Sequence, residues 1–319
     1  MKKRLKNFFI VALTILLLPI QIVNATPIQD NPTFEDIENE LFDYFKSNNL
    51  YYEKDSEEYV DYLLSILMYN EDDKLIQHPN YDNILVYASK YLNEIEGRES
   101  SEIEYIIDTL EEKPLDEIKK EIKENDLNID NEIMEFKENN NDTITLYSAY
   151  NRTNAKNYAM TWAYKRNNLY NSHAYDCTNF VSQAVFAGGK PEKKLSPLPT
   201  GIKNTTSYWY SDRYDEWKLN YSVYKWKEST SWIRVTDFYS YWAKTQKVVT
   251  SSNVNTIISN ANIGDVIQLK NKSGAWYHSM IVVNKANGTL TLAGHTSNTN
   301  NRNIKDISKD NSFRVIKFS

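Results

Sequence analysis

The chain changes character near residue 140, and this change limits what it can fold into. Residues 26–140 contain 32 acidic and 10 basic side chains, whereas residues 141–319 contain 11 acidic and 23 basic ones. The acidic part has apolar residues at helical spacing, and the basic part is rich in aromatic residues and ends in short apolar runs. We therefore predict an acidic helical domain of unknown role at 26–138, a polar linker at 139–142 and a second domain at 143–319.

The first residues have the pattern of a secretory signal peptide. Four basic residues between Lys2 and Lys6 precede the apolar run Phe8–Leu18, and Val23 and Ala25 place small residues before a cleavage site. We expect residues 1–25 to be removed and the mature chain to be secreted, either extracellular or associated with the cell wall. A retained anchor is the less favoured alternative, because the apolar run is short for a membrane span. Membrane contact is expected only through this segment before cleavage.

Apolar periodicity predicts five helices in the acidic domain. Thr33 and Asp36 form a capping-box pattern before the first helix, Pro114 ends the fourth, and the fifth is expected to end near Ile122. The apolar faces of the first four comprise Phe34, Ile37, Leu41 and Phe45; Val60, Leu63, Leu64 and Leu67; Ile84, Leu85, Ala88, Tyr91, Leu92 and Ile95; and Ile103, Ile106, Ile107 and Leu110. This domain shows neither metal-ligand spacing nor a glycine-rich phosphate loop.

The second domain begins with helices and ends with strands. One helix buries residues from Ala155 to Ala163, and another starts at Cys177 and closes at Gly188. Alternating apolar runs predict strands at 264–269, 276–283, 289–293 and 313–318, with Asn287-Gly288 as a hairpin turn. Helices followed by an antiparallel sheet give an α+β fold class.

Cys177 is the only cysteine of the chain. An exported chain with one cysteine has no internal disulfide, so its thiol is either reactive or reserved for pairing with another molecule. A position in the first turn of a helix favours the thiolate, because unpaired backbone N–H groups and the helix dipole stabilise negative charge. The plain alternative is a small buried apolar residue. We expect Asp176 to cap this helix.

Two histidines are candidates for assisting this thiol. His278 starts a predicted strand, with Met280 and Val282 on its own side, and His295 follows the returning strand across the hairpin. A cysteine nucleophile needs a base, and the base needs an orienting group, so Cys177, His278 and His295 form a candidate catalytic set. Each histidine taken alone is equally consistent with a structural or surface residue. His173 is a weaker candidate base because a loop position is expected for it.

The second domain resembles the putative amidase domain of secreted Gram-positive proteins. The resemblance rests on Tyr150-Asn151-Arg152, the run Asp176-Cys177-Thr178-Asn179-Phe180-Val181-Ser182-Gln183, Ala187-Gly188-Gly189, Gly264-Asp265-Val266-Ile267-Gln268, His278-Ser279-Met280-Ile281-Val282 and His295-Thr296. It implies a papain-like cysteine hydrolase related to NlpC-type and CHAP cell-wall enzymes. It further implies Cys177 as nucleophile, His278 as base and His295 as the orienting residue, with Asn298 as a candidate replacement.

On this basis we expect a cysteine amidase or endopeptidase that acts on peptidoglycan or another cell-wall polymer. The Cys177 N–H would contribute to the oxyanion hole, with a second donor from Tyr175 or Tyr170, whereas Asn179 and Gln183 are expected to be structural. No metal, cofactor or nucleic acid is expected. The alternatives are a catalytically silent wall-binding module and a thiol hydrolase acting on exported proteins or small amides.

The opposite charges of the two parts motivate one more hypothesis. The acidic helical domain is expected to dock on the basic domain within the same chain and restrain it, as a propeptide does. An independent spacer or a partner-binding domain is the alternative, and the sequence does not choose between them.

Overall fold

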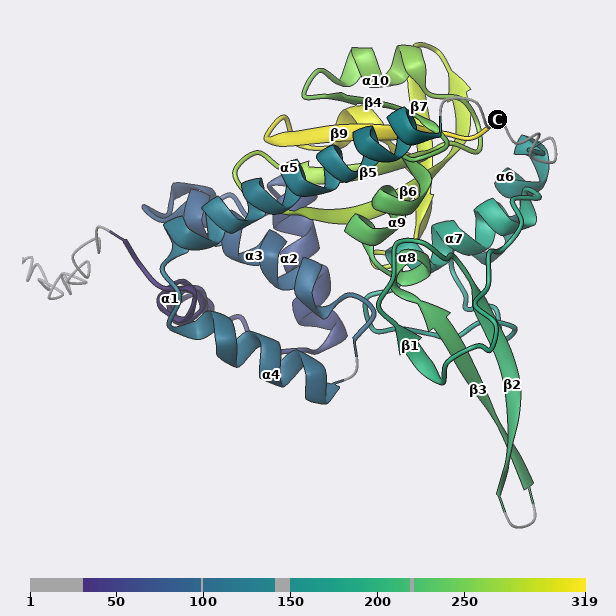
Figure 1. Ribbon diagram of the computed structural model, residues 1–319. Helices are drawn as coiled ribbons and strands as arrows, with labels where there is room; N and C mark the ends of the chain where they lie inside the picture. The colour runs from purple at the N-terminus through teal and green to yellow at the C-terminus, as the bar shows by residue number, and fades with distance from the viewer. Residues whose placement is uncertain (1–30, 99, 141–149, 219–220) are drawn as a thin grey trace, which may run out of the picture.

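The fold is α+β, with helices in the first part of the chain and an antiparallel sheet toward its end (Figure 1). The computed structural model describes residues 31–98, 100–140, 150–218 and 221–319. The predicted signal peptide, the end of the predicted linker and the predicted start of the second domain lie outside the described residues. Within the described ranges, no helix is both long and apolar enough to cross a membrane.

The predicted helices of the acidic part are all present. They are α1 (Phe34–Ser47), α2 (Glu57–Tyr69), α3 (Tyr81–Ile95), α4 (Ser100–Glu111) and α5 (Leu115–Asn139), with the short 3-10 turn η1 (Leu75–Gln77) before α3. We call residues 34–139 the helical segment. The capping box of Thr33 and Asp36 is confirmed, because each side chain accepts a hydrogen bond from the backbone N–H of the other.

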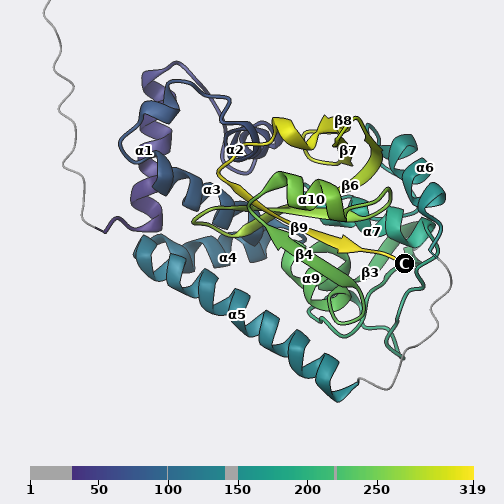
Figure 2. The ribbon, with the colours of Figure 1, turned by 90° about the horizontal axis from the view of Figure 1, so that it is seen from above.

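Helix α5 is longer than predicted. We expected it to end near Ile122, where the apolar pattern fades, but it continues to Asn139. The added turns contain neither proline nor glycine, and their Glu and Lys residues favour helix although Ile133 is the one buried residue among them. Figure 2 shows the result, a long rod that extends past the sheet while α1 to α4 gather at one side of it.

Six antiparallel strands form the main sheet. Their order is β4 (Lys247–Ser251), β9 (Asn311–Lys317), β5 (Val266–Asn271), β6 (Trp276–Ala286), β7 (Thr289–Gly294) and β8 (Thr299–Asn303), and the 3-10 turn η2 (Ile304–Asp306) follows β8. The predicted hairpin between β6 and β7 is confirmed, and Asn287 and Gly288 both adopt the positive φ that such a turn requires.

The two faces of this sheet carry separate apolar cores. One face packs against α6 (Arg152–Trp162), α7 (Cys177–Ala187), α8 (Thr230–Ile233) and α9 (Val235–Trp242), through Val266, Ile281 and Ile316. The other face presents Leu269, Met280 and similar residues to the helical segment and to α10 (Val254–Asn260). Side chains alternate between faces along a strand, so Met280 and Val282 belong to one core and Ile281 and Val283 to the other.

The helical segment shares its apolar core with the sheet. Buried residues of α1, α2 and α3 are continuous with those of β5, β6 and β9. Polar contacts fix the same interface: Ser308 N–H donates to Met68 O (2.6 Å), and the Asn93 side chain donates to Trp276 O (2.9 Å). Lys270 of β5 also forms an ion pair with Asp126 of α5. The acidic and basic parts of the chain therefore meet over a packed, mostly apolar interface.

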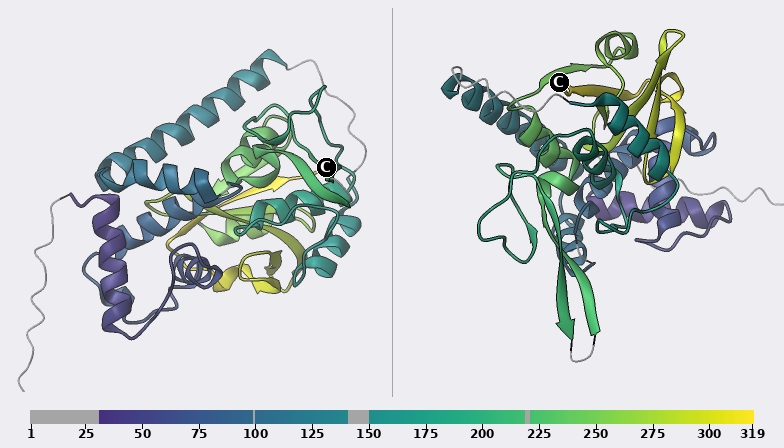
Figure 3. Two further views of the ribbon diagram at one scale, coloured as in Figure 1. Left: turned by 90° about the horizontal axis from the view of Figure 1, so that it is seen from below. Right: turned by 90° about the vertical axis from the view of Figure 1, so that its right-hand side faces the viewer.

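A second, smaller sheet projects from the body of the molecule. It consists of β1 (Gly201–Lys203), β3 (Tyr221–Ser229) and β2 (Ser211–Lys218), and the right panel of Figure 3 shows the β2–β3 hairpin standing away from the main sheet. The tryptophans of this region differ in burial, and Trp226 on β3 is half-buried. Trp209, Trp232 and Trp242 are buried, whereas Trp217 on the hairpin is 80% exposed.

Candidate active site

Cys177 lies at the start of α7, as predicted, and its side chain is completely buried. Its Sγ has as polar neighbours the Glu96 carboxyl (Oε1, 3.1 Å), the Thr178 hydroxyl (3.7 Å), the backbone N–H of Ser279 on β6 (3.4 Å) and the Tyr175 hydroxyl. The Ser279 hydroxyl continues this network to Thr178 Oγ1 (3.0 Å) and to the Gln268 amide (3.1 Å). The thiol therefore sits in the interface between α7, β6 and the end of α3.

Glu96 reaches the thiol because α3 ends one residue earlier, at Ile95. Its Oε1 also accepts from Thr178 N–H (3.3 Å), and its Oε2 accepts from Val235 N–H at the start of α9 (2.6 Å). The chain then turns at Gly97, whose φ is +63° and whose missing Cβ would lie 2.6 Å from the Ile233 side chain. Only glycine fits both conditions, so Gly97 fixes the turn that delivers the carboxyl.

Burial changes the protonation of these groups. It raises the pKa of Glu96 to about 7, partly opposed by hydrogen bonds from Cys177, Thr178 and Val235. Burial, together with the negative charge of Glu96, raises the pKa of the Cys177 thiol well above its ordinary value. The helix start was expected to favour the thiolate, but burial and the neighbouring carboxyl outweigh this effect. Cys177 is therefore a neutral thiol.

His278 directly precedes Ser279, whose backbone N–H donates to the thiol. Among the described residues, the one polar partner of the His278 ring is the Tyr175 hydroxyl, 3.4 Å from Nδ1, and no hydrogen bond joins the ring to Cys177. The predicted parity along β6 is confirmed: His278 and Met280 both face Gly294, whereas Ser279 faces Thr178. Burial lowers the pKa of His278 to about 3, so its imidazole is neutral.

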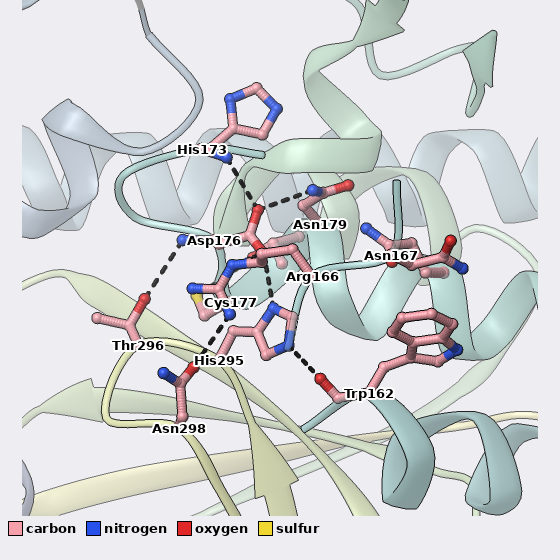
Figure 4. A network of polar contacts seen from close by, with 12 residues as sticks. Trp162, Arg166, Asn167, His173, Asp176, Cys177, Asn179, His295, Thr296 and Asn298 are labelled. Carbon is pink, nitrogen blue, oxygen red and sulfur yellow. Dashed lines mark hydrogen bonds and ion pairs between the residues drawn. The ribbon is translucent and has the colours of Figure 1, made fainter. Parts of the chain in front are cut away.

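His295 pairs with Asp176 (Figure 4), and among the described residues no hydrogen bond joins it to His278. Its Nδ1 lies 2.6 Å from Asp176 Oδ2, and its Nε2 lies 2.8 Å from the carbonyl oxygen of Trp162. Both partners offer acceptor oxygens, so each ring nitrogen of His295 is engaged by one of them. Neither nitrogen is then free to orient His278. Asn298, the predicted replacement, is exposed and accepts from the Arg166 guanidinium (3.1 Å).

The prediction that Asp176 caps α7 is wrong. Asp176 stands at the cap position, but its side chain accepts no cap hydrogen bond. Instead, Oδ2 binds His295 and the Arg166 guanidinium (3.3 Å), while Oδ1 accepts from the Asn179 amide (2.7 Å) and from the backbone N–H of His173. The carboxylate oxygens are thus occupied by these partners and not by the backbone N–H groups of the helix start.

The remaining predicted residues have structural partners. His173 Nε2 lies 3.1 Å from Glu228, whose charge raises the pKa of the imidazole although burial alone would lower it. Asn179 accepts from the Trp232 indole, and Gln183 accepts from the Tyr158 hydroxyl, as expected for structural residues. Of the two tyrosines considered as oxyanion donors, Tyr175 donates its hydroxyl to Tyr277 O, and Tyr170 stacks on Trp232. Within the described ranges, no cluster of three or more metal-ligating side chains occurs.

Loss of the Asp176 carboxylate is expected to destabilise the fold. Asp176→Asn removes the charge that compensates a buried imidazole, a change that costs about 3 kcal/mol when one partner of a buried pair is lost. Urea unfolding followed by circular dichroism measures the effect. Asp212→Asn is the matched control, because Asp212 pairs with Lys194 at the surface and its loss should change stability by less than about 0.5 kcal/mol. Equal unfolding midpoints for the two variants would contradict the structural role of Asp176.

The raised pKa of Glu96 predicts a pH-dependent stability. Between pH 4.5, the ordinary pKa of this carboxyl, and about 7, the folded chain keeps a proton that the unfolded chain has lost. This contribution is complete below 4.5 and disappears as pH rises through 7, which amounts to roughly 3 kcal/mol at about 1.36 kcal/mol per pKa unit. The groups facing Glu96 are Cys177, Tyr175, His173 and Arg234.

The measurement is the difference in unfolding free energy between the unaltered chain and Glu96→Gln. Other titrating groups are common to both chains, so they cancel in this difference. We expect the unaltered chain to lose stability relative to the variant from pH 4.5 to 7 and to stay level above 7. A difference that does not vary with pH would show that Glu96 titrates normally.

Sequence reasoning missed Glu96 altogether. It is one of 32 acidic residues between residues 26 and 140, and it belongs to no motif. The one local signal is Gly97, a glycine directly after a predicted helix, which indicates a turn but not what the turn carries toward the thiol. The pairing of Asp176 with His295 was missed for a similar reason, because the two residues lie 119 positions apart.

Comparison with known proteins places this site in a family. Residues 149–317 match the family described as putative amidase domain. Over 165 residues the chain is 30% identical to the uncharacterized protein YjcM of Bacillus subtilis (strain 168), a match that covers 49% of this chain and 33% of that protein. The chain thus spans about a third of the length of this relative. No solved structure matches. The chain belongs to the putative amidase domain family, which points to hydrolysis of amide bonds.

Proposed function

We propose that the mature chain is a secreted cysteine amidase or endopeptidase that hydrolyses amide bonds of peptidoglycan. The observation that carries the proposal is the position of Cys177, at the first turn of a buried helix that packs on an antiparallel sheet, inside the region that matches the amidase family. A helix start bearing the cysteine and a neighbouring strand bearing a histidine are the arrangement of papain-like hydrolases, so we propose that fold type for this part of the chain.

The proposed reaction has two steps. The Cys177 sulfur bonds to the amide carbonyl carbon while His278 takes the thiol proton and passes it to the leaving nitrogen, so that the C–N bond breaks and a thioester forms. Water then attacks the thioester, which releases a carboxylate and restores the thiol. Because no hydrogen bond joins His278 to the sulfur among the described residues, the base is expected to act in a conformation from which the Glu96 carboxyl has withdrawn.

The wall as substrate is supported by charge and by the predicted export. Residues 141–319 carry an excess of twelve basic side chains, which suits the anionic polymers of a bacterial wall. Exported proteins and small amides are the alternative substrates of the same chemistry. Mass spectrometry of wall digests separates these cases, because hydrolysis of the wall leaves new amine and carboxylate ends on defined muropeptides.

The function is tested by wall clearing. Purified peptidoglycan is incubated with the mature chain and with its Glu96→Ala variant, since Glu96 covers the sulfur, and each is compared with a form that also carries Cys177→Ala. We expect clearing and new muropeptide ends only where Cys177 is present. Equal clearing with and without Cys177 in both backgrounds would contradict a cysteine mechanism.

A catalytically silent wall-binding module is the second candidate. The observation that favours it is the thiol itself, which is neutral, buried and without a hydrogen bond to His278 within the described residues. Such a module would sediment with insoluble wall but release no new ends, even in the Glu96→Ala variant. Sedimentation that weakens with added salt, together with an absence of products, would favour this candidate over the hydrolase.

A further inference from the structure

We propose that the Glu96 carboxylate occupies the acyl subsite of the hydrolase as an intramolecular product mimic and keeps Cys177 latent. This inference rests on the proposed function. Hydrolysis of an amide produces a carboxylate beside the nucleophile, bound by the same donors that stabilise the transition state. The ligand class of the subsite is therefore a carboxylate or the carbonyl of an acyl group, and the chain supplies one of its own.

The contacts of Glu96 match those of such a product. Its Oε1 lies 3.1 Å from Cys177 Sγ and 3.3 Å from Thr178 N, and its Oε2 lies 2.6 Å from Val235 N. The two N–H donors belong to the starts of α7 and α9, where backbone N–H groups have no partner within the helix. A carbonyl oxygen placed where Oε1 lies would be within reach of both the sulfur and a backbone donor.

The same contacts suppress the nucleophile. A carboxylate next to a thiol opposes thiolate formation, and the thiol here is completely shielded from water. Glu96 is also poorly placed to act as a general base, because its carboxyl fills the space that the substrate carbonyl must enter. The geometry thus favours inhibition over catalysis for Glu96.

A short set of contacts holds the turn Ile95–Arg98 in place. The Arg234 guanidinium donates to the carbonyl oxygens of Glu96 (3.1 Å) and Gly97 (3.4 Å), and Glu94 pairs with Arg98 (2.8 Å). These contacts are polar, whereas Ile95 at the start of the turn belongs to the apolar core that the helical segment shares with the sheet. Withdrawal of Glu96–Arg98 alone, with Ile95 left in the core, would therefore uncover the thiol while the helices stay packed.

Thiol alkylation measures the cover directly. Because Cys177 is the only cysteine, any label from iodoacetamide on the full mature chain reports on this site. We expect slow labelling of the unaltered chain and at least about tenfold faster labelling of Glu96→Ala, since reactivity follows access and thiolate fraction. Glu96→Gln should be intermediate, because its amide N–H₂ meets the Val235 N–H donor. Asp82→Asn, an exposed charge change on α3, is the matched control and should label as slowly as the unaltered chain.

Two further variants keep the test informative if Glu96→Ala folds poorly. Gly97→Ala forces the turn away from Ile233 without touching the carboxyl and should also speed labelling. Val235→Pro removes the N–H donor at a first helical position that accepts proline, after Arg234 in extended conformation (φ −120°, ψ 137°). Val235→Pro should label faster than the unaltered chain but hydrolyse amides more slowly than Glu96→Ala. Val235→Ala keeps the N–H donor and serves as the control.

The outcomes separate this inference from the proposed function. Faster labelling and faster amide hydrolysis in Glu96→Ala and Gly97→Ala support the latent-enzyme proposal. Folded variants that label no faster than the unaltered chain overturn it. If the unaltered chain is active and Glu96→Gln abolishes that activity, Glu96 acts as a general base. That result also overturns the latent-enzyme proposal. Faster labelling with no turnover of wall or model amides would instead overturn the proposed hydrolase, and the product-mimic role with it.

Discussion

Replacement of Cys177 by alanine is expected to abolish amide hydrolysis, with kcat/KM falling on the order of 10³-fold or more, as for other enzymes that lose their nucleophile. The assay is best made in the Glu96→Ala background, in which the sulfur is uncovered. The alanine variant should fold normally, because alanine is small, apolar and favourable at a fully buried helix position.

Cys177→Ser is the informative companion to this variant. A hydroxyl keeps the size and the hydrogen bonds of the thiol, but it is a far weaker nucleophile at neutral pH. We expect turnover to be lost while the unfolding midpoint stays close to that of the parent. Retention of more than about a tenth of the activity in either variant would exclude nucleophilic catalysis by Cys177, because loss of a nucleophile lowers turnover by far more than tenfold.

Replacement of His278 is expected to lower kcat/KM by about 10²- to 10⁴-fold, the range typical of a lost general base. His278→Asn keeps a polar side chain of similar size in β6. The pH–rate profile of the parent should show a limb due to this imidazole, and that limb should be absent in the variant. Stability should change little, since the ring has a single polar partner, Tyr175, among the described residues.

His295→Asn provides the matched comparison. His295 has Asp176 and Trp162 as partners and lies against the Phe180 ring at 4.1 Å, so its loss should mainly lower stability. The reverse pattern is that His295→Asn loses the pH-dependent limb while His278→Asn retains it. In that case His295 would be the base and Asp176 its orienting group. Equal loss of turnover with no change in either profile would show that neither imidazole acts as the base.

The sequence was sufficient to predict the elements that carry the candidate site. Helix α7 begins at Cys177, and the Asn287-Gly288 hairpin joins the two strands that lead to His278 and His295, because local periodicity and turn chemistry determine both. The alternation along β6 was also predictable, and it is confirmed. Its consequence, that Ser279 and not His278 faces Thr178, depends on which side of the sheet α7 packs, and no local pattern encodes that choice.

The contacts of Glu96 could not have been predicted, for a different physical reason. A carboxylate close to a helix end is normally solvated, and only the packing of α3 over β5 and β6 carries this one into the interface. Likewise, the role of Asp176 depends on Arg166 and His295, which come from a loop and from the end of a distant strand. Long-range polar pairs of this kind follow from the tertiary fold and leave no periodic trace in the sequence.

The apolar core that the helical segment shares with the sheet has a consequence for solubility. If the chain began near residue 143, the sheet face bearing Leu269, Met280 and Phe313 would be bare, and a contiguous apolar surface of that kind promotes aggregation. The acidic helices thus bury this apolar face of the sheet. They also add negative charge, which makes molecules of the protein repel one another. Removal of the helical segment would therefore cause precipitation before any effect on amide hydrolysis could be measured.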